Sequence, residues 1–174
     1  MKKWLIALLF VCASVLAACN DSGEDQASTK DTETNKVGFS MDGGSIEEAT
    51  NVPEDKKEAI LNAFNVYIES FNNKEVDQYV DTLSTKSKGF VYKDEQEKVQ
   101  AEFDAYDTER IAKDITIVKY SEKEAHVFAN LEISRTEIST GRAGQAVGRQ
   151  VTVFVPEDGT WKVSSVHFMS SEGK

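Results

Sequence analysis

The sequence predicts one α+β domain in residues 53–174, in which helices pack against an antiparallel sheet. Two features of the sequence carry this prediction. Up to about residue 106, apolar residues recur every three or four positions, which is the period of an amphipathic helix. From Ile111 onward the period is close to two, and turn-forming segments separate the apolar runs. Helices followed by a meander of strands are typical of α+β folds with the helices on one face of the sheet.

Three helices are expected before the sheet. The first begins at Pro53, because proline suits the first helical position, and ends at residues 72–73, where asparagine tolerates a left-handed helix stop. A shorter second helix covers about residues 76–83, and a third covers about residues 94–106. Residues 90–92 between them are predicted to form a short strand. The buried face of the first helix is expected to comprise Ile60, Phe64, Tyr67, Ile68 and Phe71.

Four strands are expected in the sheet, over roughly residues 110–120, 124–137, 145–155 and 160–169. The loop between the last two ends in Gly159, which suits the left-handed position of a hairpin turn. Because the connections are short, each strand is expected to pair with the next one in an antiparallel sheet.

The amino terminus resembles the signal peptide of a bacterial lipoprotein. Two lysines precede an apolar run over residues 4–15, and Leu-Ala-Ala-Cys at residues 16–19 matches a lipobox. The resemblance implies that residues 1–18 are removed and that Cys19 carries a diacylglyceryl group on its sulfur. The run is shorter than the ~20 apolar residues that an uncleaved transmembrane helix needs. The mature chain is therefore expected at the extracytoplasmic face of the cell membrane, anchored by its lipid.

Residues 19–52 are expected to form a flexible acidic tether. Their composition is dominated by Asp, Glu, Ser, Thr, Asn and Gly, with few large apolar residues that could form a core. A flexible chain of about 30 residues has a root-mean-square reach on the order of 30 Å. This reach is enough to lift a domain clear of the membrane surface.

Charge and cysteine content exclude several classes of function. The formal net charge is −10, and removing the two lysines of the leader takes it to about −12. Such a surface repels phosphate backbones, so nucleic-acid binding is not expected. Cys12 lies in the leader, which leaves Cys19 as the one cysteine of the mature chain and precludes an internal disulfide. With only His126 and His167 as further soft ligands, neither a metal nor another cofactor is expected.

Two segments resemble the nuclear transport factor 2-like, or SnoaL-like, family, which has a cystatin-like α+β fold. Residues 63–77, Ala-Phe-Asn-Val-Tyr-Ile-Glu-Ser-Phe-Asn-Asn-Lys-Glu-Val-Asp, are similar to the opening helix pair of such domains. Residues 158–170, with Gly-Thr-Trp-Lys near the start and His-Phe-Met-Ser at the end, are similar to their last strand. The resemblance implies a curved sheet that wraps the long helix and leaves a pocket at the open end of a cone. It does not specify function, because this fold hosts isomerases, dehydratases, cyclases and assembly modules.

Strand alternation predicts charged residues on the inner face of that sheet. In residues 124–137 the apolar face continues to Arg135. In residues 145–155 the valines place Arg149 on the same face. If the two strands pair symmetrically about Arg142, then Arg135 lies opposite Arg149.

The neighbouring hairpins extend this row. A three-residue loop before the last strand pairs Arg149 with His167, and a turn at Glu122 pairs Glu109 with Arg135. Two guanidinium groups and an imidazole would suit a carboxylate or another anion. The alternative is structural: Glu109 neutralises Arg135, and an acid from a helix neutralises Arg149 at a solvated rim.

One open class of function is a non-enzymatic module. Its pocket would bind a small anionic ligand, or its surface would assemble with another surface protein. A homodimer is also open, with Phe154 and Phe168 as anchors on the outer face of the sheet.

The other open class is an isomerase or dehydratase that acts on a small hydrophobic substrate. This chemistry needs a carboxylate base opposite a hydroxyl donor inside an apolar cavity. Glu109 is the candidate base, and Tyr79 and Tyr106, two candidate pocket aromatics, are the candidate donors. A neighbouring Arg135 would lower the basicity of Glu109, so the non-enzymatic class is preferred.

Overall fold

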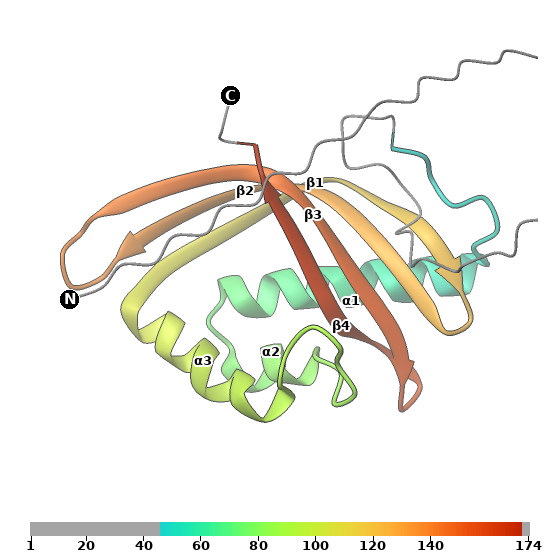
Figure 1. Ribbon diagram of the computed structural model, residues 1–174, viewed down its shortest axis with the longest axis horizontal. Coiled ribbons are helices and arrows are strands. Elements are labelled where there is room, and N and C mark those ends of the chain that lie inside the picture. Colours follow the sequence, from blue (N-terminus) through green and yellow to red (C-terminus); the bar gives the residue numbers. More distant parts are fainter. Residues whose placement is uncertain (1–45, 172–174) are drawn as a thin grey trace, which may run out of the picture. The chain divides into compact units, whose positions relative to one another are not determined.

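The computed structural model describes residues 46–171, and its helices precede an antiparallel sheet (Figure 1). The helices are α1 (Glu54–Asn72), α2 (Val76–Asp81) and α3 (Tyr92–Ala105). The strands are β1 (Tyr106–Ser121), β2 (Glu124–Glu137), β3 (Ala143–Glu157) and β4 (Thr160–Ser170). They pair in the order β1-β2-β3-β4, and every neighbouring pair is antiparallel. The predicted α+β fold class is therefore confirmed.

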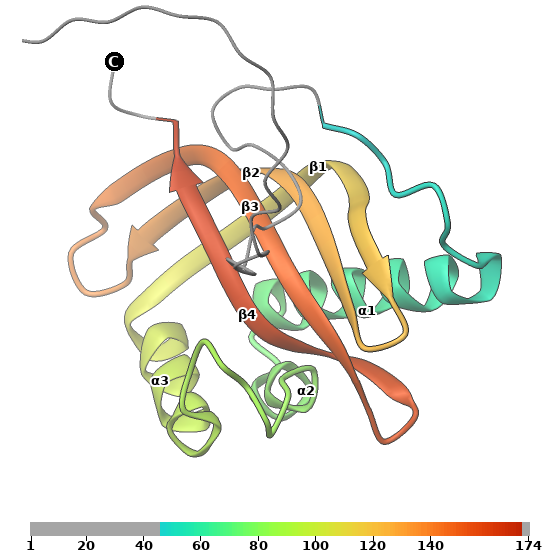
Figure 2. The ribbon, with the colours of Figure 1, turned by 45° about the vertical axis from the view of Figure 1, so that its right-hand side comes forward.

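All three helices lie on one side of the curved sheet (Figures 1 and 2). We call the side that faces the helices the inner face and the opposite side the outer face. The predicted signal peptide, Cys19 and the predicted tether up to residue 45 lie outside the described residues. Within residues 46–171, no helix is long and apolar enough to cross a membrane.

Helix α1 packs its predicted apolar stripe against the inner face. Ile60 and Phe64 are fully buried, and Tyr67, Ile68 and Phe71 are nearly so. Complete burial of such a side chain contributes about 1.5–3 kcal/mol. Sheet residues in the same core cluster are Ile117, Ala125, Val127, Ala129, Leu131, Phe154 and Val163.

The ends of α1 differ slightly from the prediction. Pro53 is the N-cap residue, so the helix begins at Glu54, one position after the predicted start at Pro53. At the other end Lys74, with φ of 58°, takes the left-handed conformation that was expected of residues 72–73. The side chain of Asn72 instead forms hydrogen bonds with the backbone of Arg110 in β1.

The segment between α2 and α3 contains no strand at residues 90–92. Tyr92 already begins α3. The one bridge to the sheet in this part of the described chain is formed by Leu83 with Val163. The prediction of a strand at residues 90–92 was therefore wrong, although the segment does lie along β4.

Strand β2 has the predicted inner face, whereas β3 has the opposite one. Phe154 pairs with Ala125 of β2 and lies in the main core. Val151 packs on the outer face with Val118 and Phe128, and we call these three residues the outer-face cluster. Both faces of β3 are thus apolar and buried, so alternation alone could not identify the inner one. The residues of β3 with even numbers face the helices.

One extra residue in β4 reverses the faces of its second half. The register shifts between Val163 and Ser165, which leaves Ser164 without a cross-strand partner. As a result His167 pairs on the outer side with a member of the outer-face cluster. Its neighbour Phe168 lies on the inner face.

Residues 46–52, the end of the predicted tether, contact the sheet at β1. Ile46 packs against the outer-face cluster. The amide of Ala49 donates a hydrogen bond to the carbonyl of Ile117 at 2.8 Å. Ala49 and Val52 also pack against the main core. This segment therefore passes the free edge of β1 before α1 begins.

Candidate functional site

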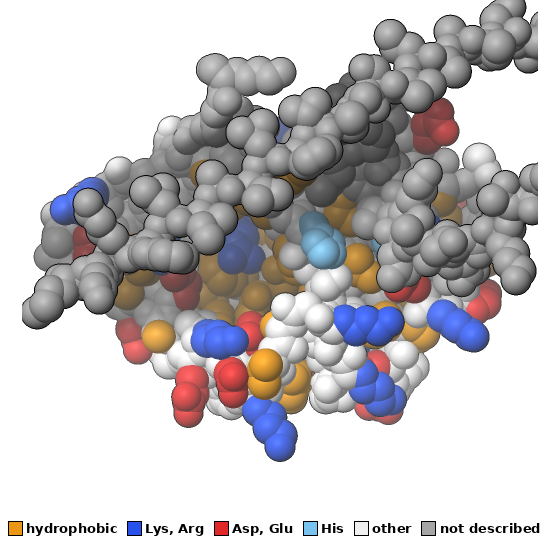
Figure 3. All heavy atoms as spheres, in the orientation of Figure 1, with side chains coloured by type: hydrophobic (Ala, Val, Ile, Leu, Met, Phe, Trp, Pro, Cys, Tyr) orange, Lys and Arg blue, Asp and Glu red, His pale blue; other side chains and the backbone are white. Residues whose placement is uncertain are grey.

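A pocket of about 400 Å³ lies between the inner face of the sheet and the helices, and we call it the inner pocket. Its apolar wall includes Leu83, Phe90, Ile133, Val163, Val166 and Phe168. Its polar groups include Tyr67, Tyr79, Glu95, Arg110 and Gln150. In Figure 3, hydrophobic side chains are visible in a hollow between the sheet and the helices, with charged side chains around it. A second hollow of about 370 Å³ adjoins the inner pocket at Arg110.

Arg110 of β1 is the cation of the inner pocket, and its backbone is fixed by α1. The Asn72 side-chain amide donates to the Arg110 carbonyl at 2.9 Å, and its oxygen accepts from the Arg110 amide at 2.9 Å. The guanidinium carbon lies 3.4 Å from the centroid of the Phe71 ring, as in a cation–π contact. Its Nη1 donates to the Tyr67 hydroxyl at 3.4 Å. Within residues 46–171, no carboxylate forms an ion pair with Arg110.

Two tyrosines line the pocket next to Arg110. The ring centroids of Tyr67 and Tyr79 are 5.4 Å apart, and Tyr79 also meets the edge of Phe71. Burial raises the pKa of Tyr79 well above its ordinary value, and the nearby Arg110 only partly opposes this rise. The Tyr79 hydroxyl therefore stays protonated at physiological pH and can donate a hydrogen bond.

The loop after α2 forms one wall of the inner pocket and is held by β3. The carboxylate of Glu157 accepts a hydrogen bond from the Ser84 hydroxyl at 2.6 Å and also accepts from the Thr85 hydroxyl. These hydrogen bonds lower the pKa of Glu157 below its usual range. Further along, the Ser87 hydroxyl donates to the carbonyl of Ser164 at 2.7 Å. The wall that carries Leu83 is thus attached to both strands of the last hairpin.

Of the predicted charged row, only Arg135 lies on the inner side. Its Nη2 lies 2.6 Å from a carboxylate oxygen of Glu102 in α3. Its guanidinium carbon lies 3.4 Å from the centroid of the Tyr106 ring. The structural alternative was thus right that an acid neutralises Arg135, but the acid is Glu102 rather than Glu109. The same contact covers one face of Tyr106, a predicted pocket aromatic.

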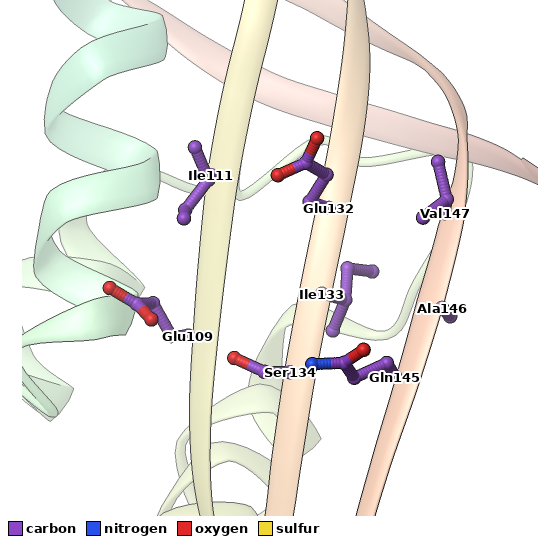
Figure 4. A pocket seen from close by; sticks show the side chains of 8 residues that line it. All are labelled: Glu109, Ile111, Glu132, Ile133, Ser134, Gln145, Ala146 and Val147. Atoms are coloured by element: carbon purple, nitrogen blue, oxygen red, sulfur yellow. The ribbon is translucent and has the colours of Figure 1, made fainter.

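Glu109 lies on the outer face, against the prediction. The β1 register pairs it with Ser134, and Thr108 takes the predicted place opposite Arg135. Figure 4 shows Glu109 in a separate hollow of about 300 Å³, together with Ser134 and Gln145 of the neighbouring strands. Glu109 therefore cannot act as a base opposite Tyr79 in the inner pocket.

Arg149 and His167 also lie on the outer face. Arg149 pairs with Asn130 of β2 and Met169 of β4, instead of with Arg135 and His167. His167 pairs with Val151, and its Nε2 lies 3.4 Å from the Ser165 hydroxyl. The predicted anion site of Glu109, Arg135, Arg149 and His167 is therefore not assembled in this fold.

The two predicted dimer anchors lie on the inner side of the sheet. Phe154 is fully buried in the main core, and Phe168 is a wall of the inner pocket with 39% of its surface exposed. Neither side chain is available on the outer face. The prediction that they form an exposed apolar patch there was wrong.

Sequence reasoning missed Arg110 because β1 is irregular. Asp114 has φ of 53°, and the register with β2 shifts between Lys113 and Thr116 and again beyond Ile117. Ile117 pairs with Val127 as predicted. In the part of β1 before the shift, the residues that were predicted to face inward face outward, and Arg110 faces inward instead. Lys113, which interrupts the apolar alternation, is the one signal in the sequence for this irregularity.

The chain matches the model of a known protein family. A family model described as the C-terminal domain of anti-sigma-I factor RsgI9 matches residues 62–172. The matched region includes most of α1, both other helices and the whole sheet. No curated protein matches the chain.

Solved structures with the same architecture are distant in sequence. A candidate aromatic ring hydroxylase from Novosphingobium aromaticivorans has 14% identity and a TM-score of 0.63, over 70% of this chain and 92% of that one. A candidate scytalone dehydratase from the same organism has 15% identity and a TM-score of 0.59, over 67% and 85%. A ketosteroid isomerase-like protein from Erwinia carotovora has 17% identity and a TM-score of 0.57, over 70% and 100%. These likenesses establish a nuclear transport factor 2-like fold.

Proposed function

The chain belongs to the family of the C-terminal domain of anti-sigma-I factor RsgI9, and we propose that its domain binds a small ligand in the inner pocket. The observation that carries the proposal is the combination of an apolar wall with Arg110, a cation that has no carboxylate partner within residues 46–171. Ligand pockets typically have volumes of about 300–1,000 Å³ and a few convergent polar groups on apolar walls. The inner pocket fits this description, with a volume of about 400 Å³ in the lower part of that range.

Recognition is a better proposal than turnover. The base that an isomerase or dehydratase would use, Glu109, lies on the other face of the sheet. The carboxylate of Glu95 lines the inner pocket, but it lies 2.9 Å from the ammonium of Lys98. The ion pair means that this acid already has a cation as its partner.

Filling the inner pocket should abolish ligand binding. Val166→Trp places an indole at the pocket mouth, where Val166 is 37% exposed and the larger side chain need not enter the core. The matched control is Val147→Trp on the outer face, where Val147 is 48% exposed. A set of small aromatic and aliphatic compounds is screened by ligand-observed NMR against the three proteins.

Compounds that bind the unmodified protein should lose binding to the Val166→Trp variant and keep binding to the Val147→Trp variant. Circular dichroism should give all three proteins the same fold, because both sites are partly exposed. The proposal fails if the unmodified protein binds no compound, or if the Val166→Trp variant binds as the unmodified protein does.

We further propose that the domain works at the extracytoplasmic face of the cell membrane, anchored by a lipid on Cys19. The support is the lipobox at residues 16–19 after an apolar run of signal-peptide length. A diacylglyceryl group supplies two chains, and two chains give stable anchoring where one gives only marginal binding. The predicted tether leads from Cys19 to the first described residue, Ile46.

Cys19→Ala should move the protein from the membrane fraction to the medium without unfolding it. Cys19 lies outside residues 46–171, which contain the core. The measurement is fractionation of expressing bacteria, followed by circular dichroism of the released protein. Retention in the membrane fraction of a Cys19→Ala variant whose apolar leader has been removed would contradict lipid anchoring.

A further inference from the structure

We propose that the inner pocket selects a hydrophobic, planar monocarboxylate, and that Arg110 is the residue that receives the carboxylate. This inference rests on the proposed function, because it specifies the ligand of the same pocket. The proposed anion site is thus Arg110 alone, in place of the four-residue site that was expected from the sequence. Four features of the pocket support it: the contacts of Arg110, the hydroxyl donors beside it, the position of Glu95 and the nature of the walls.

Arg110 is prepared to bind an anion. The Phe71 ring supports one face of its guanidinium, and the paired hydrogen bonds to Asn72 fix its backbone. Pre-ordering of this kind reduces the entropy lost on binding. The remaining N–H groups form a planar fork that matches the two oxygens of a carboxylate. The other inward arginine, Arg135, already has Glu102 as its partner.

Tyr67 adds a second donor beside the guanidinium. Its hydroxyl oxygen accepts a hydrogen bond from Arg110 Nη1, so its own proton is directed elsewhere. The hydroxyl of Tyr79 stays protonated next to it. A carboxylate bound to Arg110 would therefore meet neutral donors in addition to the positive charge.

Glu95 limits the ligand to one negative charge. Its carboxylate lines both the inner pocket and the adjoining hollow that Arg110 also lines. Among the residues that line the inner pocket, Arg110 is the one cation and Glu95 the one acid, so the second charge of a phosphate or a dicarboxylate would find no second cation there. A monocarboxylate is neutralised by Arg110 alone and leaves the ion pair of Glu95 with Lys98 intact.

The walls favour a flat hydrophobic body on that carboxylate. Phe90 and Phe168 line the pocket with aromatic rings, and Val163 and Val166 add aliphatic surface between them. Flat rings stack favourably on such side chains, and their burial is stabilised by the hydrophobic effect. The amide of Gln150 is directed to Thr152 at 2.9 Å, so it does not compete for the carboxylate. A body of one or two fused rings suits the volume of about 400 Å³.

The test compares 2-naphthoate with its neutral isostere 2-naphthamide by isothermal titration calorimetry. The protein is the chain from residue 19 onward, produced without lipid. The unmodified protein is expected to bind naphthoate about 10- to 100-fold more tightly than naphthamide, as a charge-assisted hydrogen bond allows. Arg110→Gln should remove this preference. The matched control Arg135→Gln should retain it, because Arg135 is occupied by Glu102.

A second variant keeps the test valid if Arg110→Gln does not fold. Tyr67→Phe retains the ring and removes the hydroxyl, and it should weaken naphthoate binding more than naphthamide binding, because a carboxylate accepts the stronger hydrogen bond. Equal binding of the two compounds to the unmodified protein would overturn carboxylate selection, while the proposed ligand-binding function would stand. Loss of the preference in the Arg135→Gln variant but not in the Arg110→Gln variant would also overturn it. Absence of binding by both compounds would overturn the inference, and failure of the wider compound screen would then separately overturn the proposed function.

Discussion

Phe154→Ala is expected to lower the free energy of unfolding by about 3–5 kcal/mol, the cost of removing a buried phenyl ring and leaving a cavity. Phe154 is fully buried in the main core, where it pairs with Ala125 on one side and Val163 on the other. Neither neighbour can move to fill the space, because both are held in the sheet. Urea denaturation followed by circular dichroism measures the loss.

Phe168→Ala provides the matched control for this prediction. Phe168 lies on the same face of the sheet as Phe154, but 39% of its surface is exposed at the pocket mouth. Its replacement should cost about 1–2 kcal/mol, less than that of Phe154, because part of its surface is already exposed and solvent can fill the space it leaves. A small effect of Phe154→Ala, equal to that of Phe168→Ala, would mean that Phe154 lies on the outer face as alternation predicted.

Gly148→Val should lower the free energy of unfolding by about 2–3 kcal/mol, because overpacking of a closed site forces backbone shifts. A Cβ atom at Gly148 would lie 2.3 Å from the carbonyl oxygen of Met169 and 2.6 Å from the Phe168 ring. The first of these atoms belongs to the backbone of β4 and cannot rotate away. The substitution should therefore displace the end of β4 and, with it, the Phe168 wall of the inner pocket.

Gly144→Val is the control on the same strand and the same face. A Cβ atom at Gly144 meets no heavy atom within 4 Å. Valine also favours strands, so the free energy of unfolding should change by less than about 0.5 kcal/mol. Thermal unfolding and the binding of 2-naphthoate are measured for both variants. Equal stability and equal binding for the two would contradict the close contact between β3 and the end of β4.

The α1 helix and β2 could be predicted because α1 has one apolar face and, in β2, Phe128 is the one apolar residue on the outer side. The α1 stripe around Phe64 has a clear helical period, and the opposite side of this helix is polar. In β2, the inward set that includes Val127 and Leu131 was identified correctly for the same reason. A pattern that is apolar on one face and largely polar on the other indicates orientation without knowledge of the partner strands.

The faces of β3 and β4 could not be predicted in this way. Val151 and Phe154 of β3 are both buried, but on opposite faces, so the valine pattern indicated the wrong one. The unpaired Ser164 then exchanges the two faces of the second half of β4. No glycine or proline in this strand indicates the irregularity. Arg149 and His167 were placed in the pocket because of these two features.

Arg110 shows why the candidate site required the structure. Its orientation depends on the register shifts near Asp114, and its support comes from Asn72, which is distant in the sequence. No local pattern connects these residues. The sequence did predict a pocket under the sheet that contains Tyr79 and an arginine. The predicted arginines were Arg135 and Arg149, whereas the arginine without a carboxylate partner in the inner pocket is Arg110.

The most direct test of a ligand site on the inner face is the position of bound 2-naphthoate, measured by intermolecular nuclear Overhauser effects. We expect contacts from the naphthalene protons to Phe90, Val166 and Phe168, which line the inner pocket. Contacts to Ile111 and Val147 instead would place the ligand in the hollow of the outer face and would contradict the proposed site.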